Sequence, residues 1–138
     1  MRISKYMLDQ QGLNRFFGPL EAKIMDILWA TEHPLSIRDV HGRLEQEKDI
    51  SFNTVMTVMN RLVDKGVLLK RLDGRSSLYR PSVTKSAFME SRSKQLTHEL
   101  LEAFGPLAVN HMIEALDEVD PDLLEKLQQK LDSMKRGG

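Results

Sequence analysis

Hydrophobic residues recur every three or four positions in three stretches of the first half of the chain. The stretches cover residues 19–33, 36–47 and 51–65. Such spacing places apolar side chains on one face of an α-helix. Ser36 and Ser51 precede the second and third stretches, and serine is a favoured N-cap. The pattern therefore predicts three short amphipathic helices, whose buried faces include Leu20, Ile24, Ile27, Leu28, Ile37, Val40, Leu44, Val55, Val58, Met59 and Leu62.

The hydrophobic period changes after Gly66, a residue suited to the position just past a helix. Residues 67–72 form a short apolar run, Asp73-Gly74 is a turn dipeptide, and residues 77–80 return before Pro81. Two short runs joined by such a turn predict a β-hairpin. Three helices followed by a hairpin is the element order of a winged helix-turn-helix.

Charged residues are balanced overall but unevenly distributed, with 20 Lys and Arg against 20 Asp and Glu. Residues 1–83 hold 13 basic and 10 acidic residues, whereas residues 84–138 hold 7 basic and 10 acidic residues. Between Arg61 and Arg80, the only acids among the many basic residues are Asp64 and Asp73. This asymmetry predicts that the first half meets a polyanion and that the second half does not.

The third predicted helix carries polar side chains opposite its apolar face. At about 100° per residue, Asn53, Thr54, Thr57, Asn60 and Arg61 point away from Val55, and Met56 lies at the flank. Asparagine suits adenine, arginine suits guanine, and threonine serves either base edges or phosphates. A hairpin arginine is placed to grip a phosphate or reach into the minor groove. The predicted DNA-binding residues are therefore Ser51, Asn53, Thr54, Met56, Thr57, Asn60, Arg61 and Arg75.

The second half predicts helices that cannot form a core by themselves. They begin near Thr84 and are interrupted at Gly105-Pro106 and before Pro121. Such short helices bury too little apolar surface to be stable alone, so we expect them to pack against a second copy in a symmetric dimer. The residues expected at this interface are Leu100, Phe104, Leu107, Met112, Ile113, Leu116, Leu123, Leu124, Leu127 and Leu131.

The predicted fold is mainly α with a small β-hairpin. It consists of an N-terminal winged helix-turn-helix followed by a helical dimerisation region. We assign residues 1–17 to a flexible N-terminal arm that Phe16 and Phe17 dock, residues 18–83 to the DNA-binding domain, and residues 84–138 to the dimerisation domain.

Composition excludes several other classes of protein. With 41% hydrophobic and 29% charged residues, the chain is of ordinary globular composition. No stretch approaches the ~20 apolar residues of a membrane span, and the first residues are too polar for a secretion signal. The absence of Cys excludes disulfides, thiolate metal sites and cysteine nucleophiles. We expect a cytoplasmic protein without membrane contacts.

Two other functions are consistent with parts of the sequence. Winged helices also serve as protein-interaction modules without nucleic-acid binding, and a net charge near zero favours that alternative. Histidine and glutamate lie one helical turn apart at His41 and Glu45, His98 and Glu102, and His111 and Glu114. A catalytic zinc needs three protein ligands, and no catalytic motif is present, so we expect no enzyme activity, metal or cofactor.

Three segments resemble the penicillinase repressor family, of the BlaI/MecI/CopY type. Pro19–Trp29 resembles its first helix, Ser51–Gly66 its recognition helix, and Arg75–Pro81 its wing. The resemblance implies a dimeric repressor on an inverted-repeat operator, with double-stranded DNA and a second copy as partners. It also implies a sensor protease that cuts the dimerisation region before an aromatic residue, for which the nearest counterpart is Asn110-His111. The Cys-rich metal site of the copper-responsive branch has no equivalent here.

Overall fold

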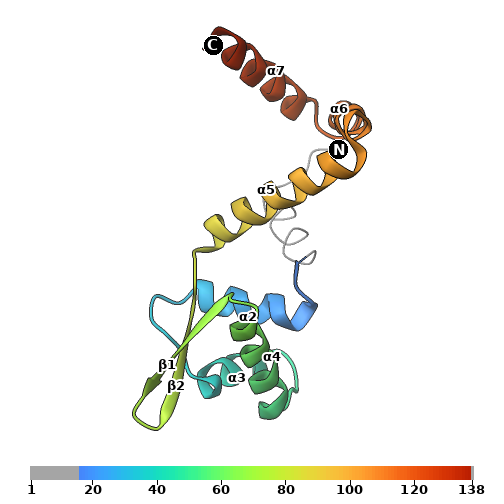
Figure 1. The fold of residues 1–138 in the computed structure, drawn as a ribbon. Helices are drawn as coiled ribbons and strands as arrows, with labels where there is room; N and C mark the ends of the chain where they lie inside the picture. Colours follow the sequence, from blue (N-terminus) through green and yellow to red (C-terminus); the bar gives the residue numbers. More distant parts are fainter. Residues whose placement is uncertain (1–15, 138) are drawn as a thin grey trace. The chain divides into compact units, whose positions relative to one another are not determined.

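The computed structural model describes residues 16–137. Among these residues, 16–90 form one compact unit and 91–137 form a second. The boundary between the units falls within a single helix, α5, which spans Lys85–Phe104 (Figure 1).

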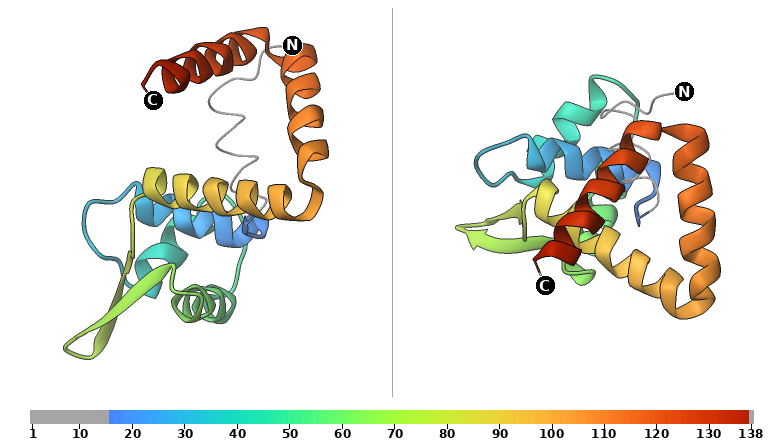
Figure 2. Two further views of the ribbon diagram at one scale, coloured as in Figure 1. Left: turned by 45° about the horizontal axis from the view of Figure 1, so that its top comes forward. Right: turned by 90° about the horizontal axis from the view of Figure 1, so that it is seen from above.

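The first unit contains three helices and a hairpin in the predicted order. The helices are α2 (Pro19–Trp29), α3 (Ile37–Glu45) and α4 (Phe52–Asp64), and the antiparallel strands are β1 (Leu68–Asp73) and β2 (Ser76–Pro81). The hairpin projects beyond the three helices (Figure 2). This arrangement is a winged helix-turn-helix, and the predicted fold class is confirmed.

Local capping explains where the helices of the first unit begin. Ser36 Oγ accepts a hydrogen bond from the backbone N–H of Asp39, and Ser51 Oγ accepts one from that of Thr54, both at 3.1 Å. Each serine thereby satisfies a donor that the first helical turn leaves open. Pro19 occupies the first position of α2, where a missing N–H costs nothing. The two predicted serine caps are confirmed.

Two glycines with positive φ shape the chain around the hairpin. Gly66, at φ 79°, follows the C-cap of α4 and turns the chain into β1. Asp73 pairs with Ser76, so the loop consists of Gly74 and Arg75 rather than of the Asp73-Gly74 dipeptide. Gly74 has φ 64° at the first loop position, as a type II′ turn requires. The turn places Arg75 at the tip of the hairpin.

The core of the first unit lies between α2, α3, α4 and the base of the hairpin. Its fully buried members are Ile24, Met25, Leu28, Leu35, Val40, Val55, Met59, Leu62, Leu68 and Tyr79. The apolar faces predicted for the three helices contribute most of these residues, which confirms the periodicity.

An aromatic cluster binds the start of α5 to the first unit. Phe88 is 5% exposed and stacks on Phe17 with ring centroids 5.2 Å apart, and its ring lies 5.6 Å from that of Trp29. Phe16 meets the edge of Phe88 at 6.1 Å. The predicted docking residues of the N-terminal arm therefore pack against the first unit, whereas residues 1–15 of that arm lie outside the described residues.

Two polar contacts reinforce this junction. The indole N–H of Trp29 donates to the carbonyl of Val83 at 3.0 Å, and Lys85 Nζ lies 3.2 Å from a carboxylate oxygen of Asp26. Thr84 caps α5, as predicted, through the N–H of Ala87. These contacts belong to the first unit, which extends to Glu90.

The second unit comprises the rest of α5, α6 (Pro106–Val119) and α7 (Pro121–Arg136). Gly105, at φ 54°, and Pro106 separate α5 from α6 at the predicted interruption. Asp120 is 8% exposed and caps α7 through the N–H of Asp122. No residue within α6 or α7 is buried. Within the described part of the chain, no helix combines the length and apolarity needed to cross a membrane.

Candidate nucleic-acid interface

Helix α4 has one face in the core and one in solvent. Val55, Met59 and Leu62 are each 0% exposed. On the other side, the structure brings Asn53, Thr54, Thr57 and Arg61 together around a shallow depression of about 360 Å³. These four residues are exposed, as are Ser51 and Arg75, whereas Met56 and Asn60 are half-buried. Four of the five residues of the predicted polar face therefore form one continuous surface on the helix.

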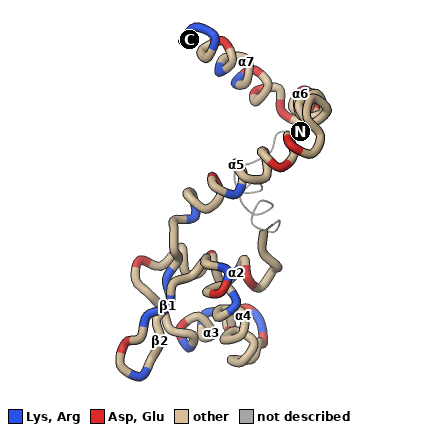
Figure 3. Tube along the Cα trace, viewed as in Figure 1, with Lys and Arg blue, Asp and Glu red and all other residues tan. Residues whose placement is uncertain are grey.

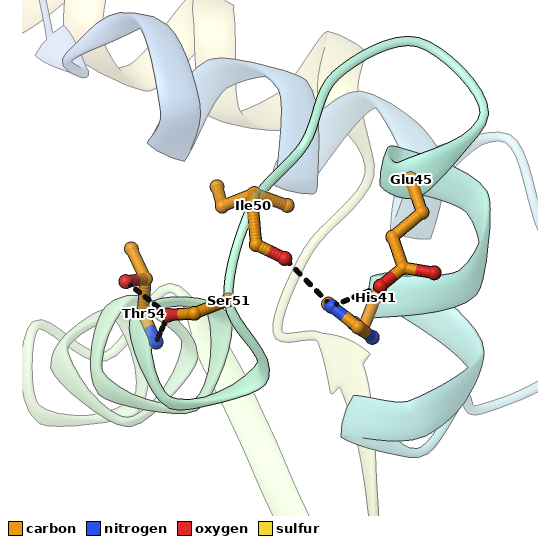
Figure 4. Close-up of polar contacts among 5 residues, drawn as sticks. All are labelled: His41, Glu45, Ile50, Ser51 and Thr54. Carbon is orange, nitrogen blue, oxygen red and sulfur yellow. Dashed lines mark hydrogen bonds and ion pairs between the residues drawn. The ribbon is translucent and has the colours of Figure 1, made fainter.

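His41 fixes the segment that leads into α4 (Figure 4). Its Nε2 lies 2.8 Å from the carbonyl oxygen of Ile50 and 2.9 Å from a carboxylate oxygen of Glu45. Both partners are acceptors, so this nitrogen carries a hydrogen and donates to them. The imidazole and the ring of Phe52 also form a T-shaped pair, with their centroids 5.7 Å apart. His41 thereby ties α3 to the turn before α4.

The N-terminal turn of α4 is held by Ser51. Besides accepting from the Thr54 N–H, its hydroxyl lies 2.7 Å from the hydroxyl of Thr54. The two hydroxyls therefore order each other at the exposed end of the helix. Across residues 16–137, no three His, Cys, Asp or Glu side chains come close enough together to hold a metal ion.

Asn60 is half-buried, and its side-chain oxygen faces the hairpin. Its Oδ1 accepts from the hydroxyl of Tyr79 at 3.1 Å and from Nζ of Lys70 at 3.4 Å. Helical periodicity predicts that Asn60 lies on the polar face, but this periodicity carries no information about the hairpin that packs there.

A groove of about 430 Å³ lies between α4, the start of α3 and the hairpin. Met56, Asn60, Lys70 and Arg38 are among its lining residues, together with Ser76 and Ser77 of β2. Arg38, an exposed cation in the first turn of α3, is absent from the predicted site.

Positive charge gathers on the hairpin and neighbouring parts of α4 (Figure 3). Lys65, at the end of α4, is compensated by Glu21 of α2 at 2.9 Å. Burial raises the pKa of Glu21, but hydrogen bonds from Lys65 and from the Gly18 N–H outweigh it, and the net pKa is lowered. Lys65 therefore supports the fold, and Arg61 and Arg75 remain as exposed cations of the predicted site.

The second unit exposes most of the residues predicted for a dimer interface. Phe104 and Leu107 are each 58% exposed, and Met112, Ile113, Leu123 and Leu131 are also exposed. Leu100, Leu116, Leu124 and Leu127 are half-buried. Leu101, Val109, Val119 and Met134 are further exposed apolar residues that the prediction did not include. Asn110 and His111 are exposed on α6.

Comparison with known proteins gives relatives that are named as regulators of transcription. The transcriptional regulator BlaI of Mycobacterium tuberculosis is 41% identical over 64 residues, which are 46% of each chain. The chain thus spans about half the length of this relative. The penicillinase repressor of Bacillus licheniformis is 25% identical over 118 residues, which cover 83% of this chain and 88% of that protein.

Among solved structures, the transcription regulator MepR of Staphylococcus aureus is similar, with a TM-score of 0.46 and 14% identity. That alignment covers 96% of this chain and 90% of MepR. The sequence profile of the penicillinase repressor family matches residues 17–133, which cover most of both units. The chain belongs to the penicillinase repressor family.

Proposed function

We propose that this protein is a DNA-binding transcriptional repressor that acts as a homodimer on an inverted-repeat operator. The observation that carries the proposal is the two-faced α4, on which Asn53, Thr54, Thr57 and Arg61 are exposed while Val55, Met59 and Leu62 are buried in the core. Its family consists of repressors and is not enzymatic, in agreement with the expectation that the chain is no enzyme.

In this proposal, α4 enters the major groove and its exposed face meets base edges. Arg61 is suited to guanine, and Asn53 to adenine. Arg75 at the hairpin tip and Arg38 beside the groove contact phosphates, which sets the register of α4 without reading sequence. Since phosphate contacts release counterions, binding weakens steeply as salt rises.

The second unit supplies the dimer contact. Its apolar side chains are exposed in the single chain, and burial of apolar area is the main driving force of association. Large exposed apolar patches mark interaction surfaces in soluble proteins. A two-fold dimer would place two copies of α4 in successive major grooves about 34 Å apart.

Control by a sensor protease is part of the same proposal. The counterpart of the cleavage position, Asn110-His111, lies in the middle of α6 and is exposed. Cleavage there would divide the apolar surface of the second unit and separate the two DNA-binding units.

Selection of bound duplexes from a random pool at physiological salt tests the proposal. We expect an inverted repeat with half-sites one helical turn apart. An unenriched pool would refute the repressor function and would favour a protein-interaction module instead.

A matched pair of variants sharpens this test. Arg61→Ala should cost about 1–3 kcal/mol of binding and relax the preference at one base pair in each half-site. Arg43→Ala removes the same charge from α3, where the guanidinium donates to Thr31 Oγ1 at 2.8 Å, and should leave the preferences unchanged. Equal effects of the two variants would contradict base reading by Arg61.

A further inference from the structure

The side chain of Asn60 is already engaged within the first unit. Its Oδ1 accepts from Tyr79 Oη at 3.1 Å and from Lys70 Nζ at 3.4 Å. Phenol and ammonium groups both donate, so the amide is oriented with its oxygen toward the hairpin. A bidentate contact of asparagine with adenine uses both the oxygen and the nitrogen of the amide. That contact would require the bonds to Tyr79 and Lys70 to break.

Tyr79 is a fixed point of the fold. Its side chain is 1% exposed, and its backbone N–H and C=O bond to Leu35 at 2.8 and 3.0 Å. Leu35 lies just before α3, so Tyr79 joins that segment, strand β2 and helix α4. A buried hydroxyl that loses its partner is costly, which keeps Asn60 in place.

Lys70 completes the arrangement from the other strand. It stands directly opposite Tyr79 in the hairpin register, and its Nζ lies 5.6 Å from the centre of the Tyr79 ring. This is the geometry of a cation–π contact. Lys70 also lines the groove between α4 and the hairpin, so Asn60 and Tyr79 together hold its charge at that surface.

We propose that Asn60 is a positioning residue that fixes the hairpin against α4 through Tyr79 and Lys70, and that it reads no base. The inference rests on the proposed function, because it concerns the contacts that join the two elements of the proposed DNA site, α4 and the hairpin. The chain connection between them is short and contains Gly66. The contacts at Asn60 therefore determine where Arg75 lies relative to the exposed face of α4.

A double-mutant cycle on the selected duplex tests the proposal. Tyr79→Phe removes only the buried hydroxyl, which cannot itself touch DNA, and Asn60→Ala removes its acceptor. Each variant should weaken binding about three- to tenfold, and the double variant should be no weaker than either alone. Both should keep the base preferences of the original protein. As a matched control, Thr57→Ala on the exposed face should change a base preference and add its effect to that of Tyr79→Phe.

A second cycle with Arg75 separates positioning from general stabilisation. If the contacts at Asn60 position the hairpin, Arg75→Ala should weaken DNA binding by the original protein but have little further effect on binding by Tyr79→Phe. Unfolding followed by Trp29 fluorescence shows that each variant is folded at the assay temperature. If Asn60→Ala does not fold, the cycle of Tyr79→Phe with Arg75→Ala still tests the proposal.

Three results would overturn the inference while leaving the repressor function intact. The first is a changed base preference in Asn60→Ala with unaltered binding by Tyr79→Phe. The second is additive losses in the first cycle, and the third is an unchanged cost of Arg75→Ala in Tyr79→Phe. Failure of the original protein to select any duplex would instead refute the proposed function itself, and this inference with it.

Discussion

Phe88 provides a direct test of the junction between α5 and the first unit. Phe88→Ala removes a ring that is 5% exposed and that contacts Phe17, Phe16 and Trp29. Replacement of a buried phenylalanine by alanine costs about 3–5 kcal/mol. The aromatic contacts keep the loss above the lower end of that range, because each adds about 0.5–1.5 kcal/mol beyond its buried area. We expect the free energy of unfolding of the first unit to fall by about 4 kcal/mol.

The chain contains a single Trp, and it lies in this cluster, so its fluorescence reports the unfolding of the first unit specifically. Urea titration should show a lower unfolding midpoint for Phe88→Ala than for the original protein. A loss of about 4 kcal/mol should also lower the Tm by more than about 10 °C for a domain of this size. A loss of stability by Phe88→Ala of less than about 1 kcal/mol would refute the assignment of Phe88 to the core.

The matched control lies on the same helix. Phe104 is 58% exposed, so Phe104→Ala should leave the Trp29 transition within about 0.5 kcal/mol of the original. Under the proposed function, it should instead weaken the dimer, which analytical ultracentrifugation measures. Equal losses in the Trp29 transition for Phe88→Ala and Phe104→Ala would contradict the division of α5 between two units.

Three further predictions concern the first unit. A Cβ at Gly42 in α3 meets nothing within 4 Å, so Gly42→Ala should stabilise by about 0.5–1 kcal/mol, whereas Gly66→Ala, at φ 79°, should destabilise by about 1 kcal/mol. Urea unfolding that moves both variants in the same direction would contradict this. Ser51→Ala should cost about 1 kcal/mol by removing the cap of α4, and Ser51→Asn should restore most of it in thermal melts. A full loss in both variants would show that the cap is not responsible. The pKa of Glu21 is lowered below its ordinary value of 4.5, so its ionised form adds stability above about pH 4.5 that is lost as pH falls through the folded-state pKa. Glu21→Gln should flatten this acid dependence in unfolding measured against pH, and an unchanged slope would remove Glu21 as its source.

Local patterns in the sequence were sufficient for the elements and for one face of the site. Ser51 and the apolar positions of α4 are set by capping and helical periodicity, which act over a few residues. The same periodicity gave the exposed Asn53, Thr57 and Arg61, because a face that is not apolar has to point elsewhere. The family resemblance was likewise carried by short segments and was confirmed.

The features that sequence patterns did not predict depend on contacts between residues far apart in the chain. Helical periodicity predicts Asn60 on the DNA-facing surface, whereas its hydrogen bond with Tyr79 depends on the register of the hairpin. Phe88 falls within residues 84–138, the segment predicted as the dimerisation domain, yet it packs on Phe17, and the bond from Trp29 to Val83 holds the start of α5 near α2. Neither contact has a local periodicity that would reveal it.

The division into two units also explains how a chain without net charge can bind DNA tightly, given the proposed function. One winged unit can contact only the phosphates of a single half-site, so by itself it would release few counterions and bind weakly. Joining two copies through the second unit makes the second half-site contact intramolecular, at an effective concentration in the millimolar range. Two weak half-site contacts then combine into one tight complex, but only while the DNA-binding units of the two copies remain connected. The apolar residues of α6 and α7 are not buried within their own chain, so this connection depends on the partner copy. An event that cuts or unfolds α6 would therefore release DNA without altering any residue of α4.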